Sequence, residues 1–170
     1  MHTKLIFIDT ETSGLKAWKF NKPHHEILEV AALQLDDNLM IQTVLHKKYR
    51  MRRAGYADAQ ALKINGYDAL RWRQEGHDMT YEEVAELHAL LSQDCVVIVG
   101  HNISFDIRFF RALFQEHGYD WKVPPNIDTR ALARLVWQLP CLQMATIRKH
   151  NGWRMKNSHT AMKDALDCYR

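Results

Sequence analysis

The beginning of the chain constrains the fold most, because a short apolar run ends directly in two acidic residues. Residues 5–8 read Leu-Ile-Phe-Ile, which has the length and composition of a buried strand. Alternation along that strand turns the side chains of Asp9 and Glu11, which follow it, to the same side. Two carboxylates that close repel each other unless a cation lies between them. The alternative is a solvated acidic turn before Gly14, since Asp-x-Glu is also a common chance match.

The rest of the first half predicts strands, then irregular chain, then a capped helix. Residues 27–35 and 40–49 are strand candidates, joined by a turn at 36–38. Residues 50–78 are predicted to be irregular apart from a short helical piece around 57–64. Thr80 and Glu83 form a capping-box pattern, and positions 84, 87, 88 and 91 mark one face of the helix behind it.

The second half alternates strands with helices. The all-apolar run at 96–99 suits a strand buried on both faces, and 127–128 end another short strand. Helices are predicted over 104–117, from about 132 to 139 before Pro140, over 142–150 and from 160 onward. A right-handed crossover would place 96–99 parallel to the first strand. The pattern predicts an α/β fold, a mixed sheet flanked by helices.

Composition fits one globular domain over residues 1–170. Hydrophobic residues make up 46% and charged residues 25%, both typical of folded domains. No stretch approaches 18 consecutive apolar residues, so no membrane partner is expected. The three cysteines, Cys95, Cys141 and Cys168, match no disulfide framework or zinc motif, which favours free thiols and a cytoplasmic location. The net charge of +3 permits a nucleic-acid partner without requiring one.

Asp106 is an acidic residue at the start of an otherwise apolar face of a predicted helix. It shares one helix face with Phe109, Phe110 and Leu113. A buried carboxylate is costly unless it is paired or binds a metal ion. The alternative is an acid that simply interacts favourably with the start of its helix. The preceding strand favours the metal interpretation, because its exit should lie beside Asp9.

His159 and Asp164 form the third candidate group. Residues five apart do not share a helix face, so His159 must lie before the helix or in its first turn if both serve one site. Asp164 is then predicted to point inward beside the small residues Ala161 and Ala165. Asp167, on the same helix, is expected nearer to solvent.

Four carboxylates and one histidine could thus converge at one edge of the sheet: Asp9, Glu11, Asp106, Asp164 and His159. Such a group requires divalent metal ions, and oxygen ligands without thiolates favour Mg²⁺ or Mn²⁺ over zinc. Two such ions about 4 Å apart form the arrangement used for in-line attack on phosphodiesters. A nearby histidine can then accept the proton of the attacking water.

The three acidic segments read FIDTETSGL at 7–15, HNISFD at 101–106 and HTAMKDA at 159–165. In this order they resemble the motifs of the DEDDh 3′–5′ exonucleases, the DnaQ-like family on the ribonuclease H-like fold. Residues 27–31, 61–66 and 128–130 resemble further landmarks of the family, so the resemblance extends over about residues 5–168. It implies a central five-stranded mixed sheet flanked by helices.

The resemblance also implies roles for the site residues. Asp9, Glu11, Asp106 and Asp164 would hold two divalent metal ions, Mg²⁺ or Mn²⁺. His159 would be the general base that deprotonates the attacking water. The reaction would release nucleoside 5′-monophosphates from the 3′ end of a nucleic acid.

A further group of residues would grip the 3′-terminal nucleotide: Thr12, Leu15, Ile64, Asn65 and Phe105. The three apolar members suit wedging or stacking against a base, with plain core packing as the alternative. Two other positions qualify the resemblance. His101 is a rival base that we interpret as structural or phosphate-facing, and Gln60 stands where some relatives carry an acid.

Basic residues gather between positions 47 and 73: Lys47, Lys48, Arg50, Arg52, Arg53, Arg71 and Arg73. They could follow the phosphates of a bound strand, although solvated loop charges are the more common meaning. Trp72, between two of these arginines, could stack on a displaced base.

The expected function is a metal-dependent 3′–5′ exonuclease that acts on single-stranded DNA or RNA with a free 3′ end. One alternative is a non-catalytic nucleic-acid-binding or interaction module of the same fold. Another is a phosphodiesterase for dinucleotides or very short RNA, which a dependence on substrate length would reveal. A homodimer and a separate polymerase chain both stay open as partners.

Overall fold

The computed structural model describes residues 3–19, 22–153 and 159–170. Its strands are β1 (Lys4–Thr12), β2 (Trp18–Lys19), β3 (Lys22–Pro23), β4 (Ile27–Leu35), β5 (Ile41–Lys48), β6 (Val96–Gly100) and β7 (Asn126–Asp128). Its α-helices are α1 (Ala59–Ile64), α2 (Ala69–Glu75), α3 (Tyr81–Leu91), α4 (Ser104–Glu116), α5 (Thr129–Val136), α6 (Met144–His150) and α7 (Ala161–Tyr169), and a 3₁₀ turn spans Ala54–Tyr56. Among the described residues, no helix combines the length and apolar character needed to cross a bilayer.

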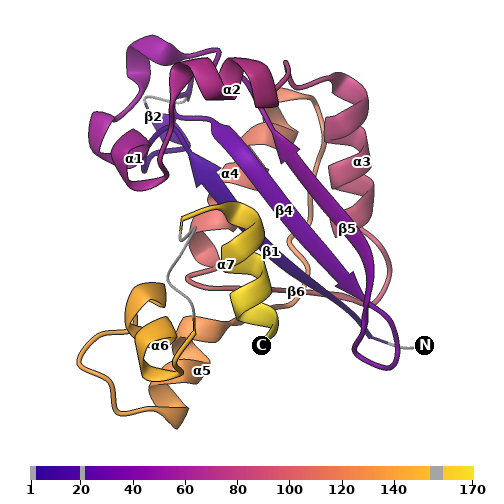
Figure 1. The fold of residues 1–170 in the computed structure, drawn as a ribbon. Helices are drawn as coiled ribbons and strands as arrows, with labels where there is room; N and C mark the ends of the chain where they lie inside the picture. Colours follow the sequence, from indigo (N-terminus) through magenta and orange to yellow (C-terminus); the bar gives the residue numbers. More distant parts are fainter. Residues whose placement is uncertain (1–2, 20–21, 154–158) are drawn as a thin grey trace.

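Five strands form one mixed sheet in the order β5-β4-β1-β6-β7 (Figure 1). β1 and β4 pair antiparallel, as do β4 and β5, whereas β6 pairs parallel with both β1 and β7. The parallel β1–β6 pair confirms the predicted pairing of residues 96–99 with the first strand. The central strand β1 therefore has a neighbour on both sides.

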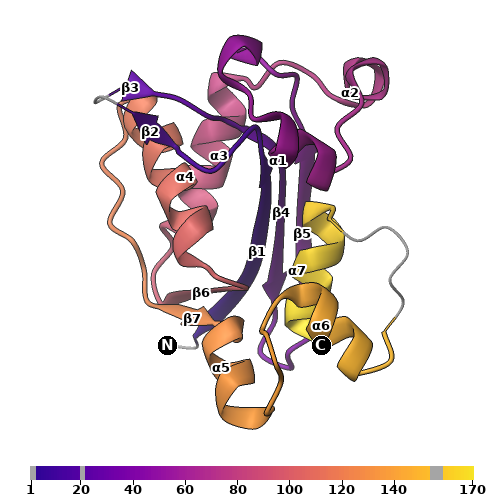
Figure 2. The ribbon, with the colours of Figure 1, turned by 90° about the vertical axis from the view of Figure 1, so that its left-hand side faces the viewer.

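The two faces of the sheet bury different side chains. Even-numbered residues of β1, Ile6 and Ile8, join the larger core with α3 and α4. Phe7 faces the opposite side and packs with Ala161 and Ala165 of α7. Figure 2 shows α3 and α4 on one side of the sheet and α7 on the other. The alternation seen in the sequence of β1 thus separates two cores.

Most elements lie where the sequence predicts them. β4 has the expected bounds, and Thr80 makes the capping box with Glu83 at the start of α3. β1 continues to Thr12, four residues beyond the apolar run, because its ladder with β4 extends past the acids. Two features were not predicted, the short β2–β3 hairpin and the helix α2 within residues 50–78.

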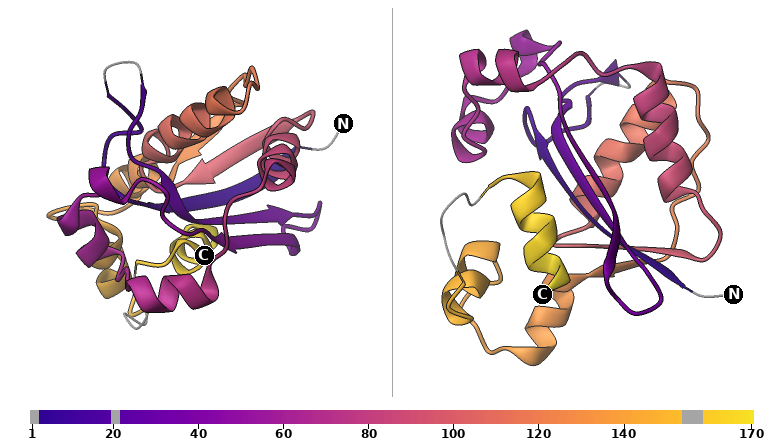
Figure 3. Two further views of the ribbon diagram at one scale, coloured as in Figure 1. Left: turned by 90° about the horizontal axis from the view of Figure 1, so that it is seen from above. Right: turned by 45° about the vertical axis from the view of Figure 1, so that its right-hand side comes forward.

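Helices α5 and α6 form a small lobe beside α7 (Figure 3). The lobe has its own core of Ala133, Leu142 and Ile147, separate from the cores of the sheet. The predicted helix over 132–139 begins earlier, at Thr129, and ends at Val136, where Trp137 takes an extended conformation. Leu135, predicted to mark an apolar face, is instead exposed.

Candidate active site

The end of β1 carries the first two acids of the site. Asp9 and Glu11 lie opposite Ala31 and Glu29 of β4, and both are half-buried. The pairing of β1 with β6 ends at Phe7, so these acids lie beyond the last rung of the parallel ladder. Both project to the face covered by α7, as the alternation of the strand requires.

Asp106 reaches the same end of β1 from the first turn of α4. Its buried carboxylate accepts a hydrogen bond of 2.7 Å from Oγ1 of Thr10. Gly100 makes this approach possible, because a Cβ there would lie 3.0 Å from the carbonyl oxygen of Ile8. The prediction that the exit of the second parallel strand lies beside Asp9 is therefore confirmed.

Asp164 comes from the first turn of α7, whose N-cap Thr160 accepts a hydrogen bond from the Lys163 amide. Ala161 and Ala165 are fully buried against the sheet, which brings this helix close, as predicted. One carboxylate oxygen each of Asp9, Glu11 and Asp164 lie within 4.8 Å of one another. Asp106 lies outside this group of three.

The crowded acids have displaced pKa values. Burial raises the pKa of Asp9 well above its ordinary range, and the charges of Asp106 and Asp164 add to this effect. Burial, with the charges of Asp164 and Glu29, raises the pKa of Glu11 to about 8. Burial also raises the pKa of Asp106 to about 7, against the lowering effect of the Thr10 hydrogen bond.

The residues fit divalent metal ions. Three oxygen donors converge without a thiolate among them, which is the donor set that Mg²⁺ and Mn²⁺ prefer. Burial and mutual repulsion disfavour the charged forms of these carboxylates. A cation bound between them would stabilise the charged forms. Asp9, Glu11 and Asp164 would hold the metal, with Asp106 available from the adjacent helix.

His159 directly precedes the N-cap of α7, and its side chain is exposed. Its backbone has φ of 64°, a left-handed conformation that costs a non-glycine residue about 1 kcal/mol or more. Such a conformation is more common at functional sites, where the surrounding structure maintains it. A histidine that shares a site with Asp164 is expected before this helix or in its first turn, and His159 lies before it.

His101, the rival base, is engaged elsewhere. Its Nε2 lies 2.7 Å from the carbonyl oxygen of Leu142, and its Nδ1 lies 3.2 Å from Oγ1 of Thr129. Burial lowers the pKa of His101. The side chain joins the end of β6 to the α5–α6 lobe, which agrees with its structural interpretation.

The prediction that Asp167 lies near solvent is wrong. Asp167 is 4% exposed, and its Oδ2 accepts a hydrogen bond of 2.6 Å from Nε of Arg148. It also pairs with Lys163 and Arg170. The cause is Arg148, a buried residue of α6 that also donates to Oδ1 of Asp164.

Sequence reasoning missed Arg148 and Glu29. Arg148 follows Met144 and Ile147 on the buried face of α6, so a charge on an apolar helix face was the available signal. Glu29 is buried directly opposite Glu11 and lies 2.7 Å from Nε2 of His46. An acid within an apolar strand was the corresponding signal there.

The residues predicted to grip the substrate divide into two groups. Leu15 is 65% exposed and Ile64 is 53% exposed, which argues against core packing for both. Thr12 and Asn65 are buried, and Nδ2 of Asn65 donates to the carbonyl oxygen of Thr12 over 3.0 Å. Phe105 is half-buried against Phe109. Asn65 therefore fastens the end of α1 to the end of β1, beside the acids.

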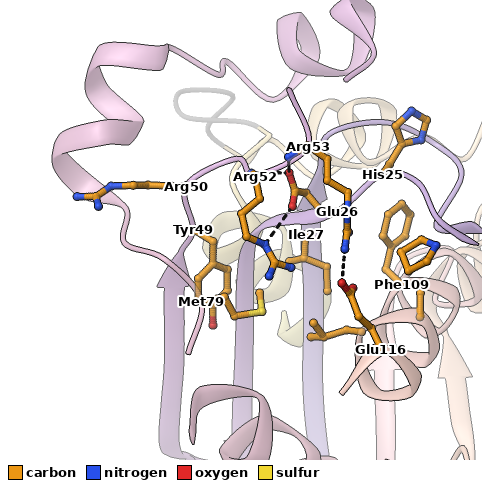
Figure 4. Close-up of a pocket in the computed structure, with 13 residues that line it drawn as sticks. His25, Glu26, Ile27, Tyr49, Arg50, Arg52, Arg53, Met79, Phe109 and Glu116 are labelled. Carbon is orange, nitrogen blue, oxygen red and sulfur yellow. Dashed lines mark hydrogen bonds and ion pairs between the residues drawn. The ribbon is translucent and has the colours of Figure 1, made fainter. Parts of the chain in front are cut away.

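The basic residues between 47 and 73 are largely paired with acids: Lys47 with Glu83, Lys48 and Arg71 with Glu75, Arg52 with Glu26, and Arg53 with Glu116. Figure 4 shows Arg52 and Arg53 turned toward these carboxylates along a pocket, with Arg50 pointing away. The proposed stacking role of Trp72 is wrong, because its ring is 1% exposed beneath Lys48 and Arg71.

Comparisons with known proteins point in one direction. The family described as "Exonuclease" (RNase_T) matches residues 6–170. A PolC-type DNA polymerase III of Pediococcus pentosaceus is 26% identical over 163 residues, which cover 95% of this chain and 10% of that protein. The 3′–5′ exonuclease DinG of Staphylococcus epidermidis is 30% identical over 86 residues, which cover 50% of this chain and 9% of that protein.

Among solved structures, E. coli exonuclease I in complex with a dT13 oligonucleotide has a TM-score of 0.84 at 20% identity. The likeness covers 99% of this chain and 40% of that one, and it establishes the ribonuclease H-like fold. The chain spans about one tenth of the length of its PolC-type relatives. The family match runs through β1, α4 and α7, the elements that bring the acids together, and this chain therefore belongs to the exonuclease family of DnaQ-like, DEDD-type nucleases.

Proposed function

We propose that this protein is a 3′–5′ exonuclease that removes nucleoside 5′-monophosphates from single-stranded DNA. The observation that carries the proposal is the convergence of one carboxylate oxygen each of Asp9, Glu11 and Asp164 within 4.8 Å, with Asp106 hydrogen-bonded to Thr10, the residue between Asp9 and Glu11. Two divalent cations held by these acids would polarise the phosphodiester and offset the negative charge of the transition state.

The chain itself supplies the proton acceptor and the grip on the substrate. His159, exposed just before α7, takes the proton of the attacking water as its oxygen bonds to phosphorus, and the 3′ oxygen of the shortened strand leaves and takes a proton from solvent. The exposed side chains of Leu15 and Ile64 flank the same end of β1 and contact the terminal base. Thr12 and Asn65 keep these two apolar residues in place through their own hydrogen bonds.

DNA is favoured as the substrate by the relatives. Those with 26% identity over most of this chain are DNA polymerases, and the exonuclease I neighbour was solved with a DNA oligonucleotide. A DNA polymerase, on the same or another chain, is for the same reason the proposed partner.

The test uses single-stranded DNA and RNA of one sequence, labelled at the 5′ end, with Mg²⁺ or Mn²⁺ and with EDTA. We expect a ladder that shortens from the 3′ end of DNA, only with metal, and faster than that of RNA. Glu11→Gln, purified identically, excludes a contaminating nuclease. Oligonucleotides that are bound but stay intact with both metals would contradict the proposal and favour a binding module. Cleavage restricted to dinucleotides would favour the short-substrate phosphodiesterase.

A further inference from the structure

Arg148 is a fully buried cation that touches the acidic site from outside the exonuclease motifs. It lies on α6, and its Nη2 donates to Oδ1 of Asp164. Its Nε donates to Oδ2 of Asp167 over 2.6 Å. One guanidinium therefore joins two carboxylates of α7 to a helix of the lobe.

Asp164 and Asp167 differ in the charges that surround them. Asp167 has no place among the candidate metal ligands, and it is buried with Arg148, Lys163 and Arg170 around it. Arg148 and Asp167 balance each other as an ion pair. The charge of Asp164 then remains for the cations, since four ligand carboxylates balance two divalent ions.

The hydrogen bond also orients Asp164. Arg148 engages Oδ1, which leaves Oδ2 of Asp164 for a metal ion. Carboxylate ligands of metals are commonly held in this way by an outer hydrogen-bond donor, and loss of such a donor costs about 10–100-fold in metal affinity or activity. The same contact ties α6 to the first turn of α7, the helix that begins just after His159.

We propose that Arg148 is a positioning residue, which holds Asp164 for metal binding and joins α7 to α6. The inference rests on the proposed metal-dependent function and adds a residue that the sequence motifs do not contain. It makes the α5–α6 lobe a part of the active centre, because displacement of α6 would withdraw the donor from Asp164.

The decisive variant is the double substitution Arg148→Met with Asp167→Asn. It removes the hydrogen bond to Asp164 and leaves the net charge around the metal ligands unchanged. Removing both partners of a buried ion pair is often neutral for stability, whereas removing one is costly. Asp167→Asn alone keeps the Arg148–Asp164 contact, and Arg170→Gln removes a cation that contacts Asp167 but not Asp164.

Mn²⁺ binding is measured by calorimetry without DNA, and cleavage of single-stranded DNA is measured against Mn²⁺ concentration. We expect the double variant to bind Mn²⁺ about 10–100-fold more weakly, with a matching shift in the half-saturating concentration for cleavage. Arg170→Gln should bind Mn²⁺ as the unchanged protein does, and Asp167→Asn, which keeps the hydrogen bond to Asp164 but leaves the charge of Arg148 unbalanced, should lose less affinity than the double variant. A purely structural role would lower cleavage at every Mn²⁺ concentration without moving the half-saturation point.

A folded double variant with unchanged Mn²⁺ affinity would overturn the inference, and so would an Asp167→Asn variant that loses as much affinity as the double one. Arg148→Lys, which keeps a cation beside Asp167 but lacks the fork that reaches both carboxylates, is tested in parallel with the same expectation, so that misfolding of the double variant does not end the test. If the unchanged protein binds Mn²⁺ but leaves DNA intact, the proposed function fails while the binding comparison still decides the role of Arg148.

Discussion

The two halves of the acidic site are supported in different ways. Asp9 and Glu11 lie on the central strand, where β4 and β6 pair with β1 and apolar cores fill both faces. Asp164 lies on α7, whose link to the α5–α6 lobe runs through buried ion pairs from Arg148. We call Asp9 and Glu11 on β1 the strand half and Asp164 on α7 the helix half. The strand half is supported by burial of apolar surface, whereas the helix half is supported also by the ion pairs of Arg148.

This difference predicts which changes disturb activity alone and which disturb the fold. Substitutions of strand acids should leave the fold intact, because their support is the backbone ladder and the neighbouring apolar side chains. Substitutions within the ion-pair network should destabilise the protein, because each leaves a buried charge without its partner.

The largest expected effect belongs to Asp9→Asn. Loss of a metal ligand should lower the cleavage rate by at least about 1000-fold, equivalent to about 4 kcal/mol or more of transition-state stabilisation. The melting temperature in EDTA should not fall, because the substitution removes one of several mutually repelling acids. The exposed Asp37→Asn is the matched control. If Asp9→Asn unfolded, the stability of the strand half would depend on the charge of Asp9, which contradicts the contrast between the two halves.

His159→Asn should be the next largest effect. Asparagine tolerates the left-handed conformation found at position 159, so the backbone is retained while the base is lost. We expect the cleavage rate to fall about 100–10,000-fold. Mn²⁺ binding, measured by calorimetry, should match that of the unchanged protein, with the exposed His150→Asn as a control. Equal loss of metal binding would mean that His159 acts as a ligand and not as a base.

The stability contrast is tested by one substitution in each half. Asp167→Ala should lower the free energy of unfolding by about 3 kcal/mol, because Arg148 loses its buried partner. Ile8→Val in the sheet core should cost only about 1 kcal/mol, the usual effect of one buried methylene. Urea unfolding of both variants gives the two values, and a larger loss for Ile8→Val would reverse the comparison.

The pH dependence of the metal-free protein tests the charges of the strand half without any loss of a side chain. The pKa of Glu11 is raised from its ordinary 4.5 to about 8 and that of Asp106 from 3.8 to about 7, so the folded state retains protons that the unfolded chain releases. The resulting stability is complete below the unfolded pKa values of 3.8 and 4.5 and is lost progressively as the pH rises from there through the folded pKa values of about 7 and about 8. Melting temperatures in EDTA should therefore fall over this range, and Mg²⁺ should raise them more at its upper end. Glu11→Gln should flatten the profile, and an unchanged slope in that variant would contradict the assignment.

Sequence alone predicted the strand half well, for a physical reason. The alternation of β1 and the bounds of β4 follow from local patterns, which the ladder then reinforces. The positions of Asp106 and Asp164 followed from helix faces marked by aromatic residues and by alanines. The residues that form these patterns lie within a few positions of the acids whose location they predict.

The helix half was predicted less well, because its contacts join distant segments. Asp167 is buried because of Arg148, 19 residues earlier on another helix, and no local pattern indicates that pairing. Outside the site, Trp72 shows the same dependence on a distant segment, since its indole nitrogen donates to the carbonyl oxygen of Leu28, 44 residues earlier. The exposed side chains of α5 show the converse, since a regular apolar spacing there does not lead to burial.

The pairing of α7 with β1 also has a consequence for when the site comes into existence. Asp9 and Asp164 are separated by 155 positions (164 − 9), and contacts of such long range form late because the closure entropy of the loop must first be overcome. The β1–β4–β5 meander forms from near neighbours and can arise early. A partly folded molecule would then carry Asp9 and Glu11 without Asp164, so the group of acids that would hold the metal ions is completed only with the native structure.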